Sequence, residues 1–276
     1  MKKSIFNLSG PILLLSTFLL FSCKEDDAPL NPEPAIGAFE DEVVVNSTFE
    51  DLDNVTIDVM QSSGLGLRTT GMTTLCAGAT VNHDLNAKKI TVNFGTTGCT
   101  GPQGNVRKGK IIFTYSGTNF LFPGTSIVAT FEGYEVNGYK IEGRRTLTNS
   151  GVDLASSTIT LAVKIENGKV TWPDNTFVTF NSDQVRKLKL GSTGYEASIA
   201  GTASGKSREG KDYSLAITQD LMVKQSCVTT GVYIPIAGIL ELTYQGIVIS
   251  ADYGAGNCDK KILITYPGGT REITAD

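Results

Sequence analysis

Apolar and polar residues alternate along most of the chain from about residue 73 onward. Residues 159–165 give the cleanest example, and residues 90–94, 213–217 and 247–253 repeat the pattern. Alternation of this kind predicts strands with one buried face, as in antiparallel sheets. We therefore predict a mainly β fold, in which an antiparallel meander of long strands forms an open or curved sheet.

The first of two Asn-Gly pairs, at residues 137–138, predicts a tight hairpin. Asn and Gly favour two-residue turns because both turn residues need positive φ. A turn here would place Glu135 opposite Lys140, and Tyr134 opposite Ile141. One face of the hairpin would then carry an ion pair and the other an apolar pair.

The second Asn-Gly pair, at residues 167–168, predicts another hairpin by the same reasoning. It would place Glu166 opposite Lys169. We expect Pro173 to end regular pairing on the returning strand, because proline lacks a backbone N–H. A third turn is expected near residues 209–210, where a Glu-Gly pair separates two alternating stretches.

One stretch near the start of the folded part has helical spacing. Ser47 and Glu50 have the Ser-x-x-Glu arrangement of a capping box, in which each side chain satisfies a backbone N–H at the start of a helix. We predict one short N-terminal helix that begins here, ends near residues 62–64 and packs on the sheet. Its apolar residues recur at helical spacing: Phe49, Leu52, Val55 and Val59.

The first 22 residues have the layout of a bacterial secretory signal. A short positive region with Lys2 and Lys3 precedes an apolar core over residues 12–21. Small Ser22 then precedes Cys23. The apolar core is too short for a membrane-spanning helix, which needs about 20 apolar residues. The alternative to a lipoprotein signal is an ordinary cleaved signal followed by a coincidental cysteine.

The Leu-Phe-Ser-Cys sequence that ends at Cys23 resembles the lipobox of bacterial lipoproteins. This resemblance implies cleavage before Cys23 and acylation of that cysteine, so that the chain is held to a membrane through its N-terminal lipid. Each buried methylene of an acyl chain adds about 0.8 kcal/mol to membrane binding.

The four residues after the cysteine are Lys24, Glu25, Asp26 and Asp27. They resemble the Lys-acidic export signal of surface lipoproteins of the Bacteroidetes, which implies an outer-membrane protein that faces the cell exterior. A solvated charged tether explains the same residues. We divide the chain into a signal peptide (1–22), an acylated cysteine with a flexible tether (23–42) and a single β-rich domain (43–276).

Four cysteines remain once Cys23 is acylated, and export favours disulfides between them. Three pairings are possible. A weak internal echo places one cysteine after an aromatic-Gly turn in each half of the chain. This echo favours Cys76–Cys99 and Cys227–Cys258, each worth about 3 kcal/mol in the entropic treatment of loop closure. The two halves of the domain are then related, or the echo is a coincidence of composition.

Composition and spacing argue against several kinds of chemistry. The net charge is −4 and no block of Lys or Arg occurs, which argues against nucleic acid as a partner. His83 is the only histidine and no Cys-x-x-Cys occurs, so we expect no metal site and no cofactor. Glu132, Glu135 and Glu142 lie close together and could serve a glycosidase. A solvated charged face explains them better, and we predict a protein that is not an enzyme.

The sequence leaves three functions open. The first is a surface-exposed binding or structural module for a glycan, a protein or another envelope component. The second is a periplasm-facing carrier of a hydrophobic ligand, and the third is a glycan-active hydrolase. An exposed strip around Trp172 and Tyr195 would favour glycan binding. An unfilled apolar face would favour the carrier, and we expect it to be lined by Tyr115, Phe131, Tyr134 and Tyr244.

Overall fold

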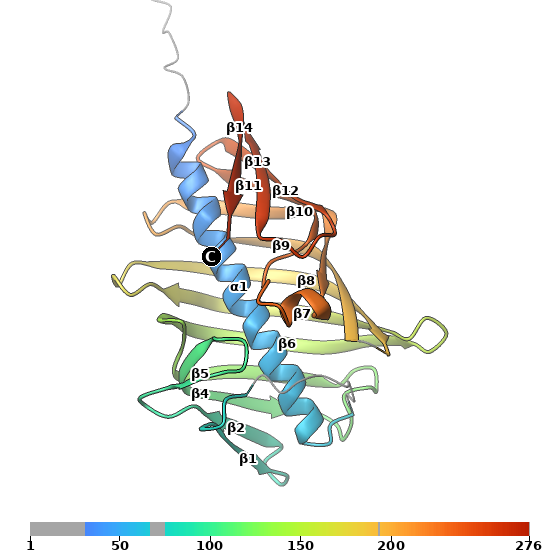
Figure 1. The fold of residues 1–276 in the computed structure, drawn as a ribbon. Helices are drawn as coiled ribbons and strands as arrows, with labels where there is room; N and C mark the ends of the chain where they lie inside the picture. Colours follow the sequence, from blue (N-terminus) through green and yellow to red (C-terminus); the bar gives the residue numbers. More distant parts are fainter. Residues whose placement is uncertain (1–30, 67–74, 193, 276) are drawn as a thin grey trace, which may run out of the picture. The chain divides into compact units, whose positions relative to one another are not determined.

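The computed structural model describes residues 31–66, 75–192 and 194–275. Within these ranges, one long helix lies on a single antiparallel sheet whose strands follow chain order, apart from the short β3, which pairs with β4 (Figure 1). The predicted mainly β meander is therefore confirmed. The signal peptide, Cys23 and the residues of the export tag lie outside the described residues.

Fourteen strands make up the sheet in the described part of the chain, and their order runs from β1 at one edge to β14 at the other. The strands are β1 Thr80–Asp84, β2 Lys89–Asn93, β3 Cys99–Thr100, β4 Val106–Tyr115, β5 Ser126–Val136, β6 Tyr139–Asp153, β7 Thr158–Thr171, β8 Phe177–Gly191, β9 Gly194–Lys206, β10 Asp212–Lys224, β11 Ala237–Tyr244, β12 Ile247–Ala255, β13 Lys261–Tyr266 and β14 Gly269–Thr274.

The N-terminal helix, α1, spans Glu33–Ser62 and is much longer than the sequence predicted. It starts after Pro32, and a proline in its first turn suits the fixed φ of that residue. The Ser47 hydroxyl lies inside the helix and donates to the Val44 carbonyl (3.0 Å), so the predicted capping box is wrong. The expected tether over residues 23–42 is corrected likewise, because residues 33–42 are helical and several of them are buried.

The core lies between α1 and one face of the sheet. Helix α1 crosses the strands from the β13–β14 end of the sheet to the β1–β4 end (Figure 1). An ion pair between Glu33 and Arg271 holds its first turn (2.6 Å), and the Leu65 carbonyl accepts from the Phe120 N–H just beyond its last turn (2.8 Å). Alternate strand residues point to α1, as in β7, where Leu161 is buried. A second, short helix, α2, spans Gln225–Val228.

The hairpin predicted at residues 137–138 is confirmed. Asn137 and Gly138 have φ of 52° and 85°, and Glu135 lies opposite Lys140. The expected ion pair between those two residues does not form. Glu135 instead pairs with Lys108 on β4, with Nζ and Oε2 2.8 Å apart. Lys140 pairs with Glu142 on its own strand. A bulge in β5 also takes Tyr134 out of the register expected with β6.

The hairpin predicted at residues 167–168 is wrong, because β7 passes through these residues without turning back. Asn167 has a φ of 52° and sits in a β-bulge between β7 and β8. Gly143 on β6 makes the bulge possible, since a Cβ at that position would lie 2.6 Å from the Asn167 carbonyl oxygen. Glu166 therefore lies opposite Arg144 on β6, not Lys169.

The other expected features of the sheet are confirmed. β9 and β10 are joined by a turn in which the Gly210 N–H donates to the Ser207 carbonyl (2.8 Å). β7 ends before Pro173.

Both predicted disulfides form, Cys76–Cys99 and Cys227–Cys258. In each half, one cysteine lies in the sequence between two long strands that pair antiparallel. Cys99 lies between β2 and β4, and Cys258 lies between β12 and β13. Common descent of the two halves stays a prediction.

Candidate functional site

One concave site is a groove that runs along one face of α1, which we call the α1 groove. Two more open hollows, of about 600 and 710 Å3, are lined by strands between β6 and β10. The volume of the α1 groove is about 700 Å3, which is within the range usual for ligand sites. Four other segments form its walls, at residues 103–105, 136–139, 231–234 and 273–275. Helix α1 provides the floor through Glu40, Val43, Val44, Ser47, Thr48 and Asp51.

The spacing of the floor residues explains why the groove exists. They recur every three or four positions, so they share one face of the helix. This face is only partly covered: Glu40 is exposed and Val44 and Ser47 are half-buried, whereas Val43, Thr48 and Asp51 are buried. From Glu40 to Asp51 the groove follows the helix for about 16 Å, at 1.5 Å per residue.

The lining of the groove is mixed in character. Apolar side chains come from α1, from the end of β5, from the 231–234 loop and from the end of β14. Two tyrosines, Tyr139 and Tyr233, stand in the walls, and the rim carries charges of both signs, Glu40 and Lys260. The amide side chains are Gln103, Asn105 and Asn137.

Two of these amides belong to a relay that ends on a buried ion pair. The Asn137 amide donates to Asn105 Oδ1 (2.8 Å), and the Asn105 amide donates to Asp51 Oδ1 (2.7 Å). Arg107 on β4 binds both oxygens of Asp51, with its Nε 2.8 Å from Oδ2. Burial by itself lowers the pKa of Arg107, but the Asp51 carboxylate outweighs this and the pKa is raised. The relay therefore ties the wall of the groove to α1.

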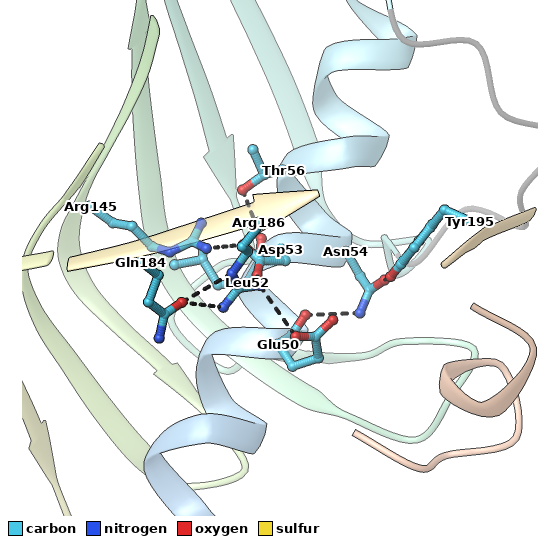
Figure 2. A network of polar contacts seen from close by, with 9 residues as sticks. All are labelled: Glu50, Leu52, Asp53, Asn54, Thr56, Arg145, Gln184, Arg186 and Tyr195. Atoms are coloured by element: carbon cyan, nitrogen blue, oxygen red, sulfur yellow. Dashed lines mark hydrogen bonds and ion pairs between the residues drawn. The ribbon is translucent and has the colours of Figure 1, made fainter. Parts of the chain in front are cut away.

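A second buried network lies at the same level of α1, on Glu50, Asp53 and Asn54, which flank Asp51 in the sequence (Figure 2). Arg145 on β6 and Arg186 on β8 both form ion pairs with Asp53, and Arg186 also reaches Glu50 (3.5 Å). The side-chain oxygen Oε1 of Gln184 accepts hydrogen bonds from Nη2 and Nε of Arg186 (3.0 and 3.1 Å). Burial raises the pKa of Glu50 to about 7, although Arg186 opposes the shift.

Arg145 is the least well satisfied member of this network. Its side chain is 1 % exposed, and its Nε and Nη1 have no hydrogen-bond partner within the described ranges. Burial lowers its pKa, while the Asp53 carboxylate opposes this effect. Beside it, the Tyr195 hydroxyl donates to Asn54 Oδ1 (3.0 Å), and the Asn54 amide donates to the Glu50 carbonyl (2.9 Å). These polar contacts fix the rotation and the height of α1 on the sheet.

Glu42 is a further buried acid on α1, away from the arginines. Its side chain accepts from the Asn46 amide (3.1 Å). Burial raises the pKa of Glu42 to about 8, and the nearby Asp41 adds to the shift. The pKa values of Tyr213 and Tyr253 are raised too, first by burial and then by Glu42. The carboxyl is therefore protonated at neutral pH.

The acidic residues considered for glycosidase chemistry lie apart from this groove. Glu132 pairs with Lys110 (3.4 Å), Glu135 with Lys108, and Glu142 with Lys140 (3.1 Å). These pairs follow the exposed face of the sheet, as a solvated charged face would. His83 on β1 shares a hydrogen bond with the Tyr115 hydroxyl (2.7 Å).

The aromatic residues considered for a carrier are part of a filled core. Tyr134 and Tyr244 are buried, and Tyr115 and Phe131 pack against the same cluster. The two gaps between α1 and the sheet hold only about 40 Å3 each. That volume is close to the roughly 30 Å3 that one water molecule occupies in the liquid.

The aromatic residues considered for glycan binding do not form an exposed strip. Tyr195 is buried against Asn54. Trp172 is half-buried, with the Arg208 guanidinium 4.9 Å from its ring centroid and Tyr139 packed edge-on against it.

The ion-pair network escaped the sequence analysis, although one signal for it was present. Arg145 is two residues from Leu147, and Arg186 is two residues from Leu188. Residues two apart on a strand share a face, so both arginines were in phase with core positions. Arginine in such a position needs a buried carboxylate, and α1 supplies it.

Comparison with family models, with curated protein sequences and with solved structures finds no match. The described ranges contain no helix with the length and apolar character needed to cross a membrane. They also contain no group of three or more His, Cys, Asp or Glu side chains placed to share a metal ion.

Proposed function

We propose that this protein is a lipid-anchored, cell-surface binding module whose ligand occupies the α1 groove. The observation that carries the proposal is the groove itself, a preformed concavity of about 700 Å3 with mixed polar and apolar walls. Sites for ligands are few in a protein and have these properties. The anchor at Cys23 and the export tag enter through the lipoprotein resemblance.

The other two functions find less support in the same structure. A carrier needs free apolar volume. Helix α1 packs closely on the sheet, and the gaps between them hold only about 40 Å3 each. A retaining or inverting hydrolase needs two carboxyl groups that face each other across a substrate. The three candidates, Glu132, Glu135 and Glu142, are each paired with a lysine on the exposed face.

The proposal is tested by filling the groove. Ser47 is half-buried on the groove floor, so Ser47→Trp would place an indole ring in the ligand space. Ser214→Trp is the matched control, because Ser214 is exposed on β10 and does not line the groove. The probes are a display library of random peptides and a glycan array, applied to the full acylated chain in detergent micelles.

We expect at least one probe class to bind the wild type and Ser214→Trp alike, and Ser47→Trp to lose most of that binding. Binding that survives Ser47→Trp would move the ligand site elsewhere. A wild type that binds neither probe class would contradict a binding function in this groove.

A further inference from the structure

We propose that the ligand of the α1 groove is an extended polypeptide segment, which adds as a further strand to the free edge of β14. This inference rests on the proposed function for the location of the site, and it names the class of ligand. It starts from the main chain of β14, because three residues at the end of that strand, 273–275, stand in the groove wall.

β14 is the last strand of the sheet and has one unpaired edge. It pairs with β13 in a register without bulges, from Lys261 opposite Thr274 to Tyr266 opposite Gly269. Within the described ranges, no strand pairs with its other edge. An unpaired edge presents a row of N–H and C=O groups that can accept another strand.

The hydrogen-bond pattern shows which residues point their main chain outward. The Ala275 N–H donates to the Lys260 carbonyl (2.9 Å), which continues the β13–β14 register by one residue. In an antiparallel ladder, hydrogen-bonded pairs alternate with pairs that do not exchange bonds. Thr274, Glu272 and Thr270 therefore direct their N–H and C=O groups away from β13, and all three are exposed.

Few residues of α1 approach β14. Helix α1 packs against β11 and β12, and it reaches β14 through the ion pair between Glu33 and Arg271. Thr274 lines the same groove as Glu40, Val43 and Val44 of α1. A strand added to β14 would lie about 4.8 Å from it, on the side of its outward main-chain groups.

The side chains of the groove favour a polypeptide over a glycan. A glycan is recognised through free side-chain donors and acceptors. The Asn137 and Asn105 amides are engaged in the relay to Asp51, whereas Gln103 Oε1 has no hydrogen-bond partner within the described ranges. The hydroxyls of Ser47 and Thr48 donate to the Val44 carbonyl. The groups of β14 that remain for a ligand are main-chain groups, which is what strand addition uses.

The apolar residues of the groove suit the side chains of such a segment. In strand addition, main-chain hydrogen bonds supply affinity, and pockets for alternate side chains supply specificity. Val43 and Val44 on α1 and Ile234 across the groove provide apolar contacts on the floor and the wall. A segment with alternate apolar residues would place them here and keep the others in water.

The test separates main-chain from side-chain recognition at one position. Thr274→Pro removes the outward N–H, and proline is tolerated at the edge of a sheet when its position makes no ladder bond. Thr274→Ala keeps that N–H and removes only the side chain. Thermal unfolding of both variants shows whether either change affects the fold.

The probes are the random-peptide display library and the glycan array used on the full chain. We expect peptides to be selected, to bind Thr274→Ala as they bind the wild type, and to bind Thr274→Pro about tenfold more weakly, as the loss of one hydrogen bond implies. Bound peptide should also slow hydrogen exchange at the amides of Thr270, Glu272 and Thr274.

Each other outcome separates the two proposals. Glycan binding without peptide binding, lost in Ser47→Trp, would overturn strand addition and keep the groove as the site. Peptide binding with unchanged exchange at the three amides would also overturn strand addition, and this readout stands even if Thr274→Pro unfolds. Binding of neither probe class would overturn both.

Discussion

Glu42→Gln is the substitution whose effect follows most directly from the structure. The Glu42 side chain is buried on α1, where burial raises its pKa from 4.5 to about 8. Glutamine has nearly the same shape and can still accept a hydrogen bond from the Asn46 amide. The change therefore removes one property, the ability to ionise in a buried position.

The sign of the pH effect follows from proton linkage. The folded state keeps a proton on Glu42 that the unfolded chain releases above its lower pKa. The stabilising contribution is present below pH 4.5 and is lost as the pH rises through about 8. One pH unit corresponds to 1.36 kcal/mol, so the full loss is at most roughly 5 kcal/mol.

The assay is urea unfolding of the wild type and Glu42→Gln at about pH 5, 7 and 9, with the disulfides left oxidised. The two proteins should have similar stability at the lowest pH, and Glu42→Gln should be more stable by several kcal/mol at the highest. Other titrating groups cancel in the difference. Glu40→Gln is the control, because Glu40 is exposed on the same helix and the change makes the same substitution outside the core.

A difference between the wild type and Glu42→Gln that stays constant with pH would refute this reasoning. Glu42 would then ionise in the folded state without cost, through water or a cation close to its carboxyl group. A difference of the opposite sign would mean that the charged form is the one that the folded state stabilises.

Three further predictions concern the structure around the groove. Asp51→Ala leaves Arg107 buried without its counter-ion and should lower the free energy of unfolding by about 3–5 kcal/mol, measured by urea unfolding; a loss below about 1 kcal/mol would mean that water replaces the carboxylate. Gly109→Ala should lower the thermal midpoint by several degrees, since its φ is 79° and a Cβ would lie 2.0 Å from the Gly133 carbonyl oxygen; an unchanged midpoint would show that the bulge there can shift. Replacing Cys227 and Cys258 by serine should lower the free energy of unfolding by about 3 kcal/mol. A wild type with the same free energy of unfolding with and without reductant would contradict the stabilising role of that bond.

The two Asn-Gly pairs show how far local sequence determines the sheet. Both asparagines have a φ of 52°, so the local preference for positive φ was predicted correctly in each. Asn137 uses it in a hairpin, whereas Asn167 uses it in a bulge. The difference depends on Gly143 of the neighbouring strand, which lets the bulged main chain approach. The local sequence around either Asn-Gly pair does not show such a contact between different strands.

The start of α1 was missed because its stability comes from contacts with the sheet. Val, Thr and Asn are weak helix formers, and acidic residues interrupt the apolar spacing. Asp51 and Asp53 lie in the part of the helix that was predicted, and both are buried against arginines of the sheet. Most helical stability in proteins comes from tertiary packing, and here the packing includes ion pairs that periodicity does not reveal.

The α1 groove could not be predicted from any one part of the sequence. Its lining comes from five segments between Glu40 and Ala275 and from Lys260, brought together by the fold. The disulfides, in contrast, were predicted from an internal echo that places one cysteine after an aromatic-Gly turn in each half of the chain. A repeated local pattern is therefore more readable in this sequence than packing across the core.

The measurement that tests the account most directly is the exposure of the folded domain on intact cells. The turn between β6 and β7 contains Leu154, which is 86 % exposed, so a site for a sequence-specific protease can be inserted there. We predict cleavage in intact cells, and protection until lysis when Lys24, Glu25, Asp26 and Asp27 are replaced by alanine. If the protein with the unaltered tag is protected in intact cells and cleaved only after lysis, the domain lies inside the envelope. That result would contradict a surface binding module.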